Sequence, residues 1–353
     1  MIAELCASLR DDPAYDLFLQ EGKYPLVRRH GQLHPVADRP LTRDEMAEFR
    51  AACGVPDDRN DFDTSYTAAD GTRYRASLYR HLGRHGAVLR KLKTSIPPMD
   101  ELGLPAELLV SWAARKAGLI LITGPTGSGK STSMASLLDW INGHVSKHVI
   151  TIEDPIEYLF QDNACLFSQR EVGMDTESYL YGLRQALRQS PDVIMLGEIR
   201  DAATAATTLQ ACETGHLVVA TLHSGSAVEA MERFTRLFPT EERDGVNMVL
   251  ASQLIGILSQ RLLPGTDGAL HLACESLENQ GVSRRYIQEN RWRELADLIL
   301  RDDNPANRSL LRALVDLLRA GVIDEEAARQ QLPNPQDLQR VMKGITTSGG
   351  GGR

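Results

Sequence analysis

The chain has 353 residues, a formal net charge of −8, and 42% hydrophobic and 24% charged residues. This composition is typical of a soluble globular protein of two or three domains, and its acidic balance argues against a protein whose main role is to coat nucleic acid. The five cysteines are scattered and never in C-x-x-C spacing, which argues against a disulfide framework or a zinc site and favours a reducing cytoplasm. No apolar run reaches the roughly 18 residues that a membrane span needs, and a secretory signal sequence is not expected.

Residues 1–95 predict a small α+β domain. Thr42, followed three residues later by Glu45, is a possible N-cap for an amphipathic helix. A local basic stretch, Arg80 to Lys93, interrupts the acidic chain. The elements expected here are strands over 14–19 and 26–30 with Gly31 as a turn, a helix over 41–52, and a hairpin formed by 72–79 and 86–90.

Two prolines within residues 96–101 predict a hinge linker before a second region, 102–265, in which apolar strands alternate with helices. This pattern predicts a parallel sheet covered on both faces, with ligands at the carboxyl ends of its strands. The strands expected are 119–123, 148–152, 193–197 and 217–222, and the helices are 131–142, 176–189, 201–213 and 226–237. Residues 247–263, apolar on nearly all sides, predict a buried helix.

The rest of the chain, 266–343, predicts a small helical region, with a helix that starts near Asp324 and ends before Pro333. The tail 344–353 holds four consecutive glycines and is expected to be disordered.

The most specific motif follows the strand at 119–123 and fits the phosphate-loop pattern G-x-x-x-x-G-K-[ST]. Its glycines allow backbone N–H groups to surround an anion, the lysine reaches the outer phosphates, and the serine hydroxyl can bind Mg²⁺. A glycine-rich turn that binds nothing is the alternative, but the strand–loop–helix context favours an ATP or GTP site. The motif consists of Gly124, Pro125, Thr126, Gly127, Ser128, Gly129, Lys130 and Ser131.

Phosphoryl transfer also needs carboxylates and a positive group, and four further candidates exist. Residues 149–157 end a strand with three carboxylates, the last of them Glu157. Glu198 ends another apolar strand at the Walker B position, and a salt bridge to the nearby Arg200 is its alternative role. His223 ends a third strand, where a neutral imidazole could sense the terminal phosphate. Arginines of the first domain, Arg75, Arg80, Arg84 and Arg90, could act from a neighbouring subunit.

Taken together, these residues resemble the secretion and pilus motor ATPases of the GspE/PilT superfamily, and most closely the PilT-like pilus retraction ATPases. The resemblance covers residues 14 to 342 and includes Walker A at 124–132, the acidic segment 150–158, the segment 197–201, the histidine-containing segment 214–224, and Gln169 to Thr176.

The resemblance implies a RecA-like P-loop ATPase domain of the α/β class, preceded by a small PAS-like α+β domain and followed by a helical region. It implies a homohexamer in the cytoplasm that binds ATP between subunits and acts on an inner-membrane platform protein. Glu157 would orient the attacking water, His223 would complete the catalytic set, and Glu198 would organise Mg²⁺ together with Ser131. Thr132 would belong to the nucleotide site, and Arg90, or else Arg75, would reach the nucleotide of the neighbour.

Three alternatives stay open. The arginine-rich C-terminal segment of retraction ATPases is not clear, since Val282 to Gln288 occupies its place, so the machine could be a type IVB secretion or conjugation system. A non-motor nucleotide switch could spare Glu157 and Glu198, whose presence favours hydrolysis. A nucleic-acid translocase on a RecA-like core is disfavoured by the acidic balance and the lack of an aromatic and basic groove.

Overall fold

The computed structural model describes residues 1–9, 16–29, 32–56, 58–301, 304 and 306–342. It divides into two compact units. Unit 1 consists of Met1–Ser95, Pro155–Leu159 and Gly173–Asp175, and unit 2 contains the remainder. The chain therefore passes between the units at the predicted linker and again on either side of the two short segments. The expected turn at Gly31 and the expected tail 344–353 lie outside the described residues.

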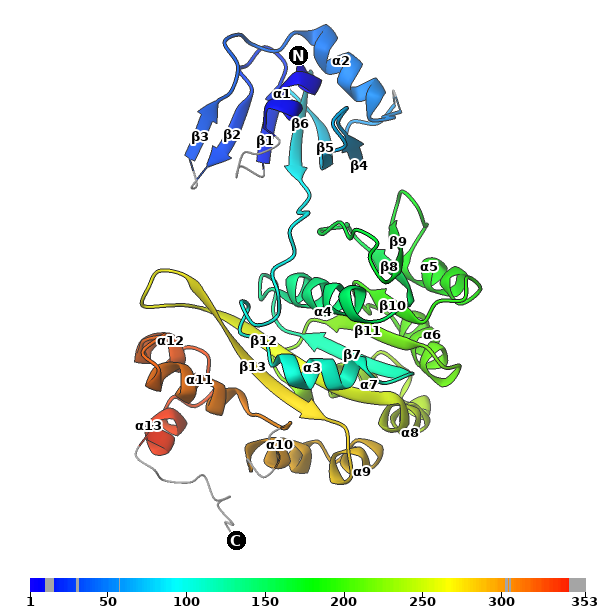
Figure 1. Ribbon diagram of the computed structural model, residues 1–353, viewed down its shortest axis with the longest axis vertical. Coiled ribbons are helices and arrows are strands. Elements are labelled where there is room, and N and C mark those ends of the chain that lie inside the picture. Colours follow the sequence, from blue (N-terminus) through cyan, green and yellow to red (C-terminus); the bar gives the residue numbers. More distant parts are fainter. Residues whose placement is uncertain (10–15, 30–31, 57, 302–303, 305, 343–353) are drawn as a thin grey trace. The chain divides into compact units, whose positions relative to one another are not determined.

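Unit 1 is built on an antiparallel six-stranded sheet in the order β3-β2-β1-β6-β5-β4 (Figure 1). Alternate side chains along β1, β5 and β6 are buried, as expected for a sheet with one covered face. Helix α2 packs Met46 and Phe49 into this core. The elements are α1 Ile2–Ser8, β1 Asp16–Gln20, β2 Leu26–Arg29, β3 Gln32–Pro35, α2 Arg43–Ala52, β4 Phe62–Thr67, β5 Arg73–His81 and β6 Arg84–Lys91.

The predicted helix and hairpin of this unit are confirmed. Thr42 caps α2, and Glu45 returns the hydrogen bond to the Thr42 backbone N–H, which completes a capping box. Strands β5 and β6 pair through to His81 and Arg84, so that only two residues form the turn. Helix α1 and strands β3 and β4 were not predicted.

Unit 2 contains a seven-stranded sheet in the order β13-β12-β7-β11-β10-β8-β9, parallel except for the β12–β13 pair. Its elements are α3 Ala106–Ala113, β7 Gly118–Thr123, α4 Lys130–His144, β8 His148–Glu153, β9 Leu166–Glu171, α5 Tyr179–Ala186, β10 Val193–Leu196, α6 Ala202–Glu213, β11 Leu217–Leu222, α7 Ala227–Arg236, a 3₁₀ turn Thr240–Glu242, α8 Arg243–Gln253, β12 Leu254–Pro264, β13 Leu270–Glu278, α9 Val282–Gln288, α10 Trp292–Leu300, α11 Leu310–Arg319, α12 Glu325–Arg329 and α13 Gln336–Met342.

Both faces of this sheet are covered, as predicted. The core against α3 and α4 includes Ile120, Ile122 and Val219, and the core against α5 to α8 includes Leu121, Ile194 and Val218. Strands β7, β8, β10 and β11 and helices α4 to α7 confirm the predicted alternation. Because the parallel strands point the same way, the loops that follow β7, β8, β10 and β11 gather at one edge.

The predicted buried helix over 247–263 is wrong from residue 254 onward. Residues 247–253 form the end of α8, but 254–263 belong to β12, a strand between β7 and β13. A central strand covered on both faces is apolar on both sides, so its sequence lacks the alternation that distinguishes a strand from a buried helix. The region after 265 is also not purely helical, since Leu270–Glu278 forms β13.

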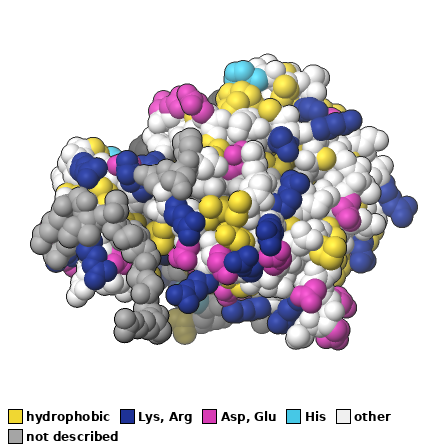
Figure 2. Space-filling view, turned by 90° about the horizontal axis from the view of Figure 1, so that it is seen from below, with side chains coloured by type: hydrophobic (Ala, Val, Ile, Leu, Met, Phe, Trp, Pro, Cys, Tyr) yellow, Lys and Arg dark blue, Asp and Glu magenta, His cyan; other side chains and the backbone are white. Residues whose placement is uncertain are grey.

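Among the described residues, no helix is long and apolar enough to cross a membrane. Figure 2 shows the end of unit 2 at which α9 and α10 lie. On this face the Lys and Arg side chains are interspersed with acidic and hydrophobic ones.

Candidate functional site

The phosphate-loop motif joins β7 to α4 at the carboxyl edge of the unit 2 sheet. Gly129 is the N-cap of α4 in a left-handed conformation, with φ 84°. Gly124 has φ 149°, and a Cβ there would lie 2.4 Å from the backbone oxygen of Gln260 on β12. The loop is therefore packed against the neighbouring strand at a distance that only glycine permits.

Lys130 folds its side chain back onto this loop. Its Nζ lies 2.9 Å from the backbone oxygens of both Gly124 and Pro125, and the residue is buried. Ser128 has a buried hydroxyl without a hydrogen-bond partner among the described residues. A buried hydroxyl without a partner is unfavourable, and an ammonium group held by carbonyls can exchange them for phosphate oxygens. The loop thus fits a phosphate-bearing ligand.

A chain of polar contacts runs from Lys130 to the ends of β10 and β11. The Nζ of Lys130 lies 3.4 Å from Nδ1 of His223, and Nε2 of His223 lies 3.3 Å from Oε1 of Glu198. Since an ammonium group only donates, Nδ1 must accept and Nε2 must carry the proton that points at the carboxylate. Burial, followed by the charge of Lys130, lowers the pKa of His223, which favours this neutral form.

Glu198 is also held from its other side. Nε of Arg200 lies 2.7 Å from its Oε2, and Nη1 of Arg200 lies 3.5 Å from Oδ2 of Asp154. The salt bridge to Arg200 therefore exists, but it leaves Oε1 directed at His223. The structure brings together three of the predicted residues, Lys130, Glu198 and His223.

The three carboxylates after β8 have different environments. Glu153 is buried, and its Oε1 accepts hydrogen bonds from Thr151 at 2.7 Å and from Gln169 at 3.2 Å. Asp154 pairs with Arg200 in unit 2, whereas Glu157 belongs to unit 1. Glu157 lines a pocket together with Arg75, Arg90, Lys91 and Lys93.

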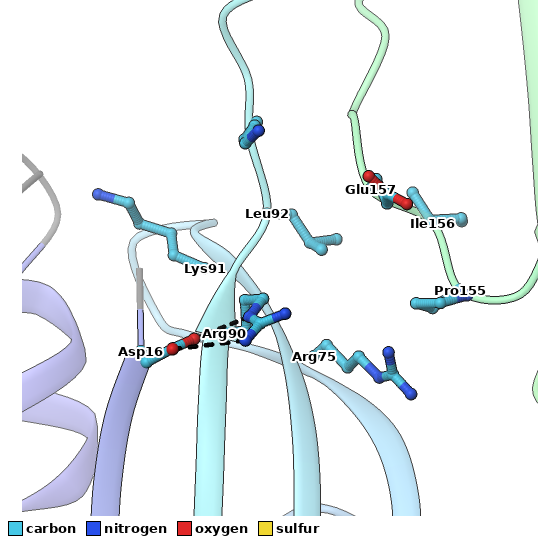
Figure 3. A pocket seen from close by; sticks show the side chains of 9 residues that line it. Asp16, Arg75, Arg90, Lys91, Leu92, Pro155, Ile156 and Glu157 are labelled. Carbon is cyan, nitrogen blue, oxygen red and sulfur yellow. Dashed lines mark hydrogen bonds and ion pairs between the residues drawn. The ribbon is translucent and has the colours of Figure 1, made fainter. Parts of the chain in front are cut away.

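That pocket, of about 390 Å³, lies in unit 1 at the end of β6 (Figure 3). Its lining residues are Asp16, Arg75, Arg90, Lys91, Leu92, Lys93, Pro155, Ile156 and Glu157. The segment that carries Glu157 is attached through the backbone: Lys93 donates to the Glu157 oxygen at 3.2 Å, and Leu159 donates to the Lys93 oxygen at 3.0 Å. Two predicted arginines and the predicted glutamate thus share one pocket.

Ion pairs hold the arginines of this pocket. Nε of Arg90 lies 2.7 Å from Oδ1 of Asp16, and Arg75 approaches Asp63 at 3.9 Å. The hydrogen bond to Asp16 is the main cause that raises the pKa of Arg90, and Glu157 adds a smaller effect. Arg80 and Arg84, the other two candidates, do not line the pocket.

The loop after His223 is fixed by three residues that the sequence did not reveal. Arg233 donates to the His223 backbone oxygen at 2.6 Å, and Arg261 donates to the Gly225 oxygen at 3.1 Å. Glu275 accepts from the Ala227 N–H at 2.7 Å, and burial raises the pKa of its carboxyl. Arg261 and Glu275 lie on β12 and β13, where a helix was expected, so no signal pointed to them.

The donor set limits the metal that could bind. Within the described part of the chain, no group of three or more His, Cys, Asp or Glu side chains is placed to hold a metal ion. Mg²⁺ commonly uses only one or two protein oxygens and takes its other ligands from water and phosphate. Ser131, in the first turn of α4, and Glu198, at the end of β10, are oxygen donors of this kind.

Comparison with known proteins gives a consistent result. Residues 74–297 match the family described as Type II/IV secretion system protein. The chain is 36% identical to the type IV pilus ATPase PilU of Pseudomonas aeruginosa, over 93% of this chain and 87% of that protein. It is 34% identical to the type IV pilus retractation ATPase PilT of the same organism, over 96% of this chain and 99% of that protein.

Solved structures are similar along nearly the whole chain. The crystal structure of the pilus retraction motor PilT with bound ADP has a TM-score of 0.87 at 38% identity, covering 96% of this chain and 99% of that one. The ATPase DotB of Legionella pneumophila has a TM-score of 0.75 at 26% identity, covering 93% and 94%.

Proposed function

The chain belongs to the family of type II/IV secretion system proteins and is an ATPase of the pilus and secretion class, and on this premise we propose that it is a hexameric motor that hydrolyses MgATP between subunits to power a type IV pilus. One observation carries the proposal: Lys130, His223 and Glu198 form a continuous polar chain at the sheet edge where the phosphate loop lies. The higher identity and TM-score of PilT, compared with DotB, favour a pilus over a secretion or conjugation machine.

The nucleotide site would be the loop from Gly124 to Thr132. Its backbone N–H groups and the N-terminus of α4 would bind the phosphates. The crystal structure of the similar motor PilT contains bound ADP, which supports a nucleotide ligand. Lys130 would release the two loop carbonyls and bind the outer phosphates, and the Ser128 hydroxyl would gain a partner.

Ser131 and Glu198 would hold Mg²⁺, which supplies positive charge to the leaving phosphate oxygens. His223 keeps a proton on Nε2 directed at Glu198, so it holds the position of that carboxylate. Since Nδ1 of His223 contacts Lys130, the histidine also couples the position of Glu198 to that of the phosphate-binding lysine.

Glu157 would accept the proton of the attacking water, and Arg90 or Arg75 would stabilise the charge of the transferred group. The three side chains line one pocket of unit 1. Whichever copy in a ring supplies the arginines therefore also supplies Glu157. The chain would act in the cytoplasm, bound to the inner membrane through a platform protein.

The test is the release of inorganic phosphate by the purified chain with ATP and Mg²⁺, with and without DNA, beside the Lys130→Ala variant. We expect turnover that DNA does not stimulate and that falls at least about a hundredfold in the variant. Absence of phosphate release at every protein concentration would refute the ATPase mechanism, and strong stimulation by DNA would favour a translocase.

A further inference from the structure

The β5–β6 hairpin lies in a stretch of the chain that contains basic residues but no acidic ones. Between Asp70 and Asp100 the sequence contains no Asp or Glu, although the whole chain carries a net charge of −8. The same stretch holds two histidines and seven cations, which are Arg73, Arg75, Arg80, Arg84, Arg90, Lys91 and Lys93. Arg75, Arg90, Lys91 and Lys93 line the pocket at one end of the hairpin, and Arg73 lies at the same end. Arg80 and Arg84 lie at the other end and have no role in that pocket.

The two-residue turn between β5 and β6 has a leucine at a position that normally favours Asn, Asp or Gly. Leu82 and Gly83 have φ values of 49° and 74°, and His81 pairs with Arg84, so these two residues form a turn in which both have positive φ. Such turns favour Asn, Asp or Gly, because a branched side chain is strained there. The Leu82 side chain is 95% exposed, so it contributes nothing to the core. A strained and fully exposed leucine points to a role outside folding.

A second turn lies beside this one. The Glu21 N–H donates to the His85 oxygen at 2.9 Å, and a Cβ on Gly22 would lie 3.3 Å from the Arg84 guanidinium. This turn, between β1 and β2, carries the exposed Lys23 and Tyr24, the latter 49% exposed. These two turns form a tip, which therefore carries an exposed leucine, Leu82, an exposed tyrosine, Tyr24, and the exposed cations Lys23, Arg80 and Arg84.

Within the two turns, residues 21–25 and 80–85, three Lys or Arg residues and one acid, Glu21, are present, and the neighbouring helix α2 adds the exposed acids Asp44 and Glu48. Burial is the main cause that lowers the pKa of His85, followed by the charges of Arg50 and Arg80, while Glu21 opposes them. On the neighbouring helix α2, the Glu45 carboxylate is bound by Arg39 at 2.7 Å. Lys23, Arg80 and Arg84 are all exposed, so their charged groups can reach an anionic surface.

The size of the tip distinguishes between possible partners. A stable protein interface buries about 800 Å² on each side, which two adjacent turns cannot offer. A lipid surface has no such requirement, since a protruding aliphatic side chain, an interfacial tyrosine and flanking arginines each bind it independently. Several weak tips on one assembly bind such a surface together.

We propose that the tip formed by Leu82, Tyr24, Arg80, Arg84 and Lys23 docks on an anionic phospholipid surface. Leu82 and Tyr24 enter the headgroup region, and the three cations bind lipid phosphates. The presence of several tips on one hexameric ring rests on the proposed function, but the binding of a single tip to lipid does not. The motor then has a direct membrane contact besides any platform protein.

The experiment measures co-sedimentation of the full chain, with ATP and Mg²⁺, with vesicles of phosphatidylcholine alone or with phosphatidylglycerol added. We expect binding to the anionic vesicles only, weakened by salt. Leu82→Asn should reduce the bound fraction several-fold without lowering the melting temperature, since Asn suits the turn. Arg80→Gln with Arg84→Gln should do the same, and Leu270→Asn, at a leucine 65% exposed on β13, is the matched control.

Phosphate release without vesicles is measured on every variant and should not change. Equal binding by the wild type and Leu82→Asn, or equal losses for Leu82→Asn and Leu270→Asn, would overturn the proposal. The proposal would also be overturned if the wild type bound no vesicles while Leu82→Asn impaired assembly of the chain, because that result would indicate a protein partner. A chain that binds vesicles through the tip but releases no phosphate would contradict the motor function and leave this proposal standing.

Discussion

Two glycines of the phosphate loop allow a matched test of its packing. Gly124 has φ 149°, and a Cβ there would lie 2.4 Å from the Gln260 backbone oxygen and 2.5 Å from the Ser128 hydroxyl. Gly127 has φ 78°, with no atom within 4 Å of its Cβ position. Both alanine variants strain the backbone, but only Gly124→Ala also collides with a central strand, which cannot move without breaking its pairing with β7 and β13.

For Gly127→Ala we expect a loss of about 1–2 kcal/mol, the cost of a left-handed conformation. For Gly124→Ala, strain of about 1–3 kcal/mol adds to overpacking of about 1–3 kcal/mol, a total of roughly 2–6 kcal/mol. At about 2–4 °C per kcal/mol for a unit of this size, Gly124→Ala should melt roughly 4–24 °C below the wild type and below Gly127→Ala.

The assay is thermal unfolding, paired with titration of a fluorescent ADP analogue. Gly124→Ala should also weaken ADP binding, because the loop must move away from β12. Equal melting temperatures and equal affinities for the two variants would refute the claim that contact with β12 shapes the loop.

Three further predictions follow from the site. Glu157→Gln and Glu198→Gln should each retain ATP binding but lose about a hundredfold or more in the rate of phosphate release. Glu213→Gln, on the exposed surface of α6, is the control and should be unchanged. A normal kcat in either variant would remove that residue from the mechanism. Arg90→Ala subunits mixed with Lys130→Ala subunits should recover some ATP turnover. Arg90→Ala subunits mixed with Glu157→Gln subunits should not, because Arg90 and Glu157 line the same pocket of one unit. Recovery of turnover in both mixtures would contradict the shared pocket. Burial raises the pKa of Glu275 above 4.5, although hydrogen bonds from the Ala227 and Leu310 backbones and then the charge of Arg261 oppose it. Its contribution to stability is therefore present below pH 4.5 and is lost as the pH rises through the raised pKa. The melting temperature of Glu275→Gln relative to the wild type should therefore increase with pH above 4.5, and a difference independent of pH would exclude this burial effect.

The sequence was sufficient where a local pattern determines the structure. The Thr42 capping box, the β5–β6 hairpin and the alternation from β7 to α7 each follow from residues close together in the chain. The approach of Lys130, Glu198 and His223 was also predictable, because each follows a parallel strand and such strand ends meet at one edge.

The unpredicted parts depend on contacts between distant segments. Strand β12 is apolar because both of its faces are covered, so its pattern could not be distinguished from that of a buried helix. Without β12 and β13, nothing in the sequence links Arg261 and Glu275 to the loop after His223. Their roles arise from hydrogen bonds to the backbone, which any suitably placed donor could make in place of Arg261 and any acceptor in place of Glu275.

The division of the acidic segment after β8 has a mechanistic consequence. Glu153 and Asp154 are held in unit 2 by Thr151 and Arg200, whereas the Lys93 backbone holds Glu157 in unit 1. Under the proposed function, the residue that accepts the proton of water therefore moves with the arginines, while Lys130 and the metal-binding residues remain with the sheet. Under the same proposal, hydrolysis requires groups from both units, so cleavage of ATP would be coupled to movement of one unit against the other.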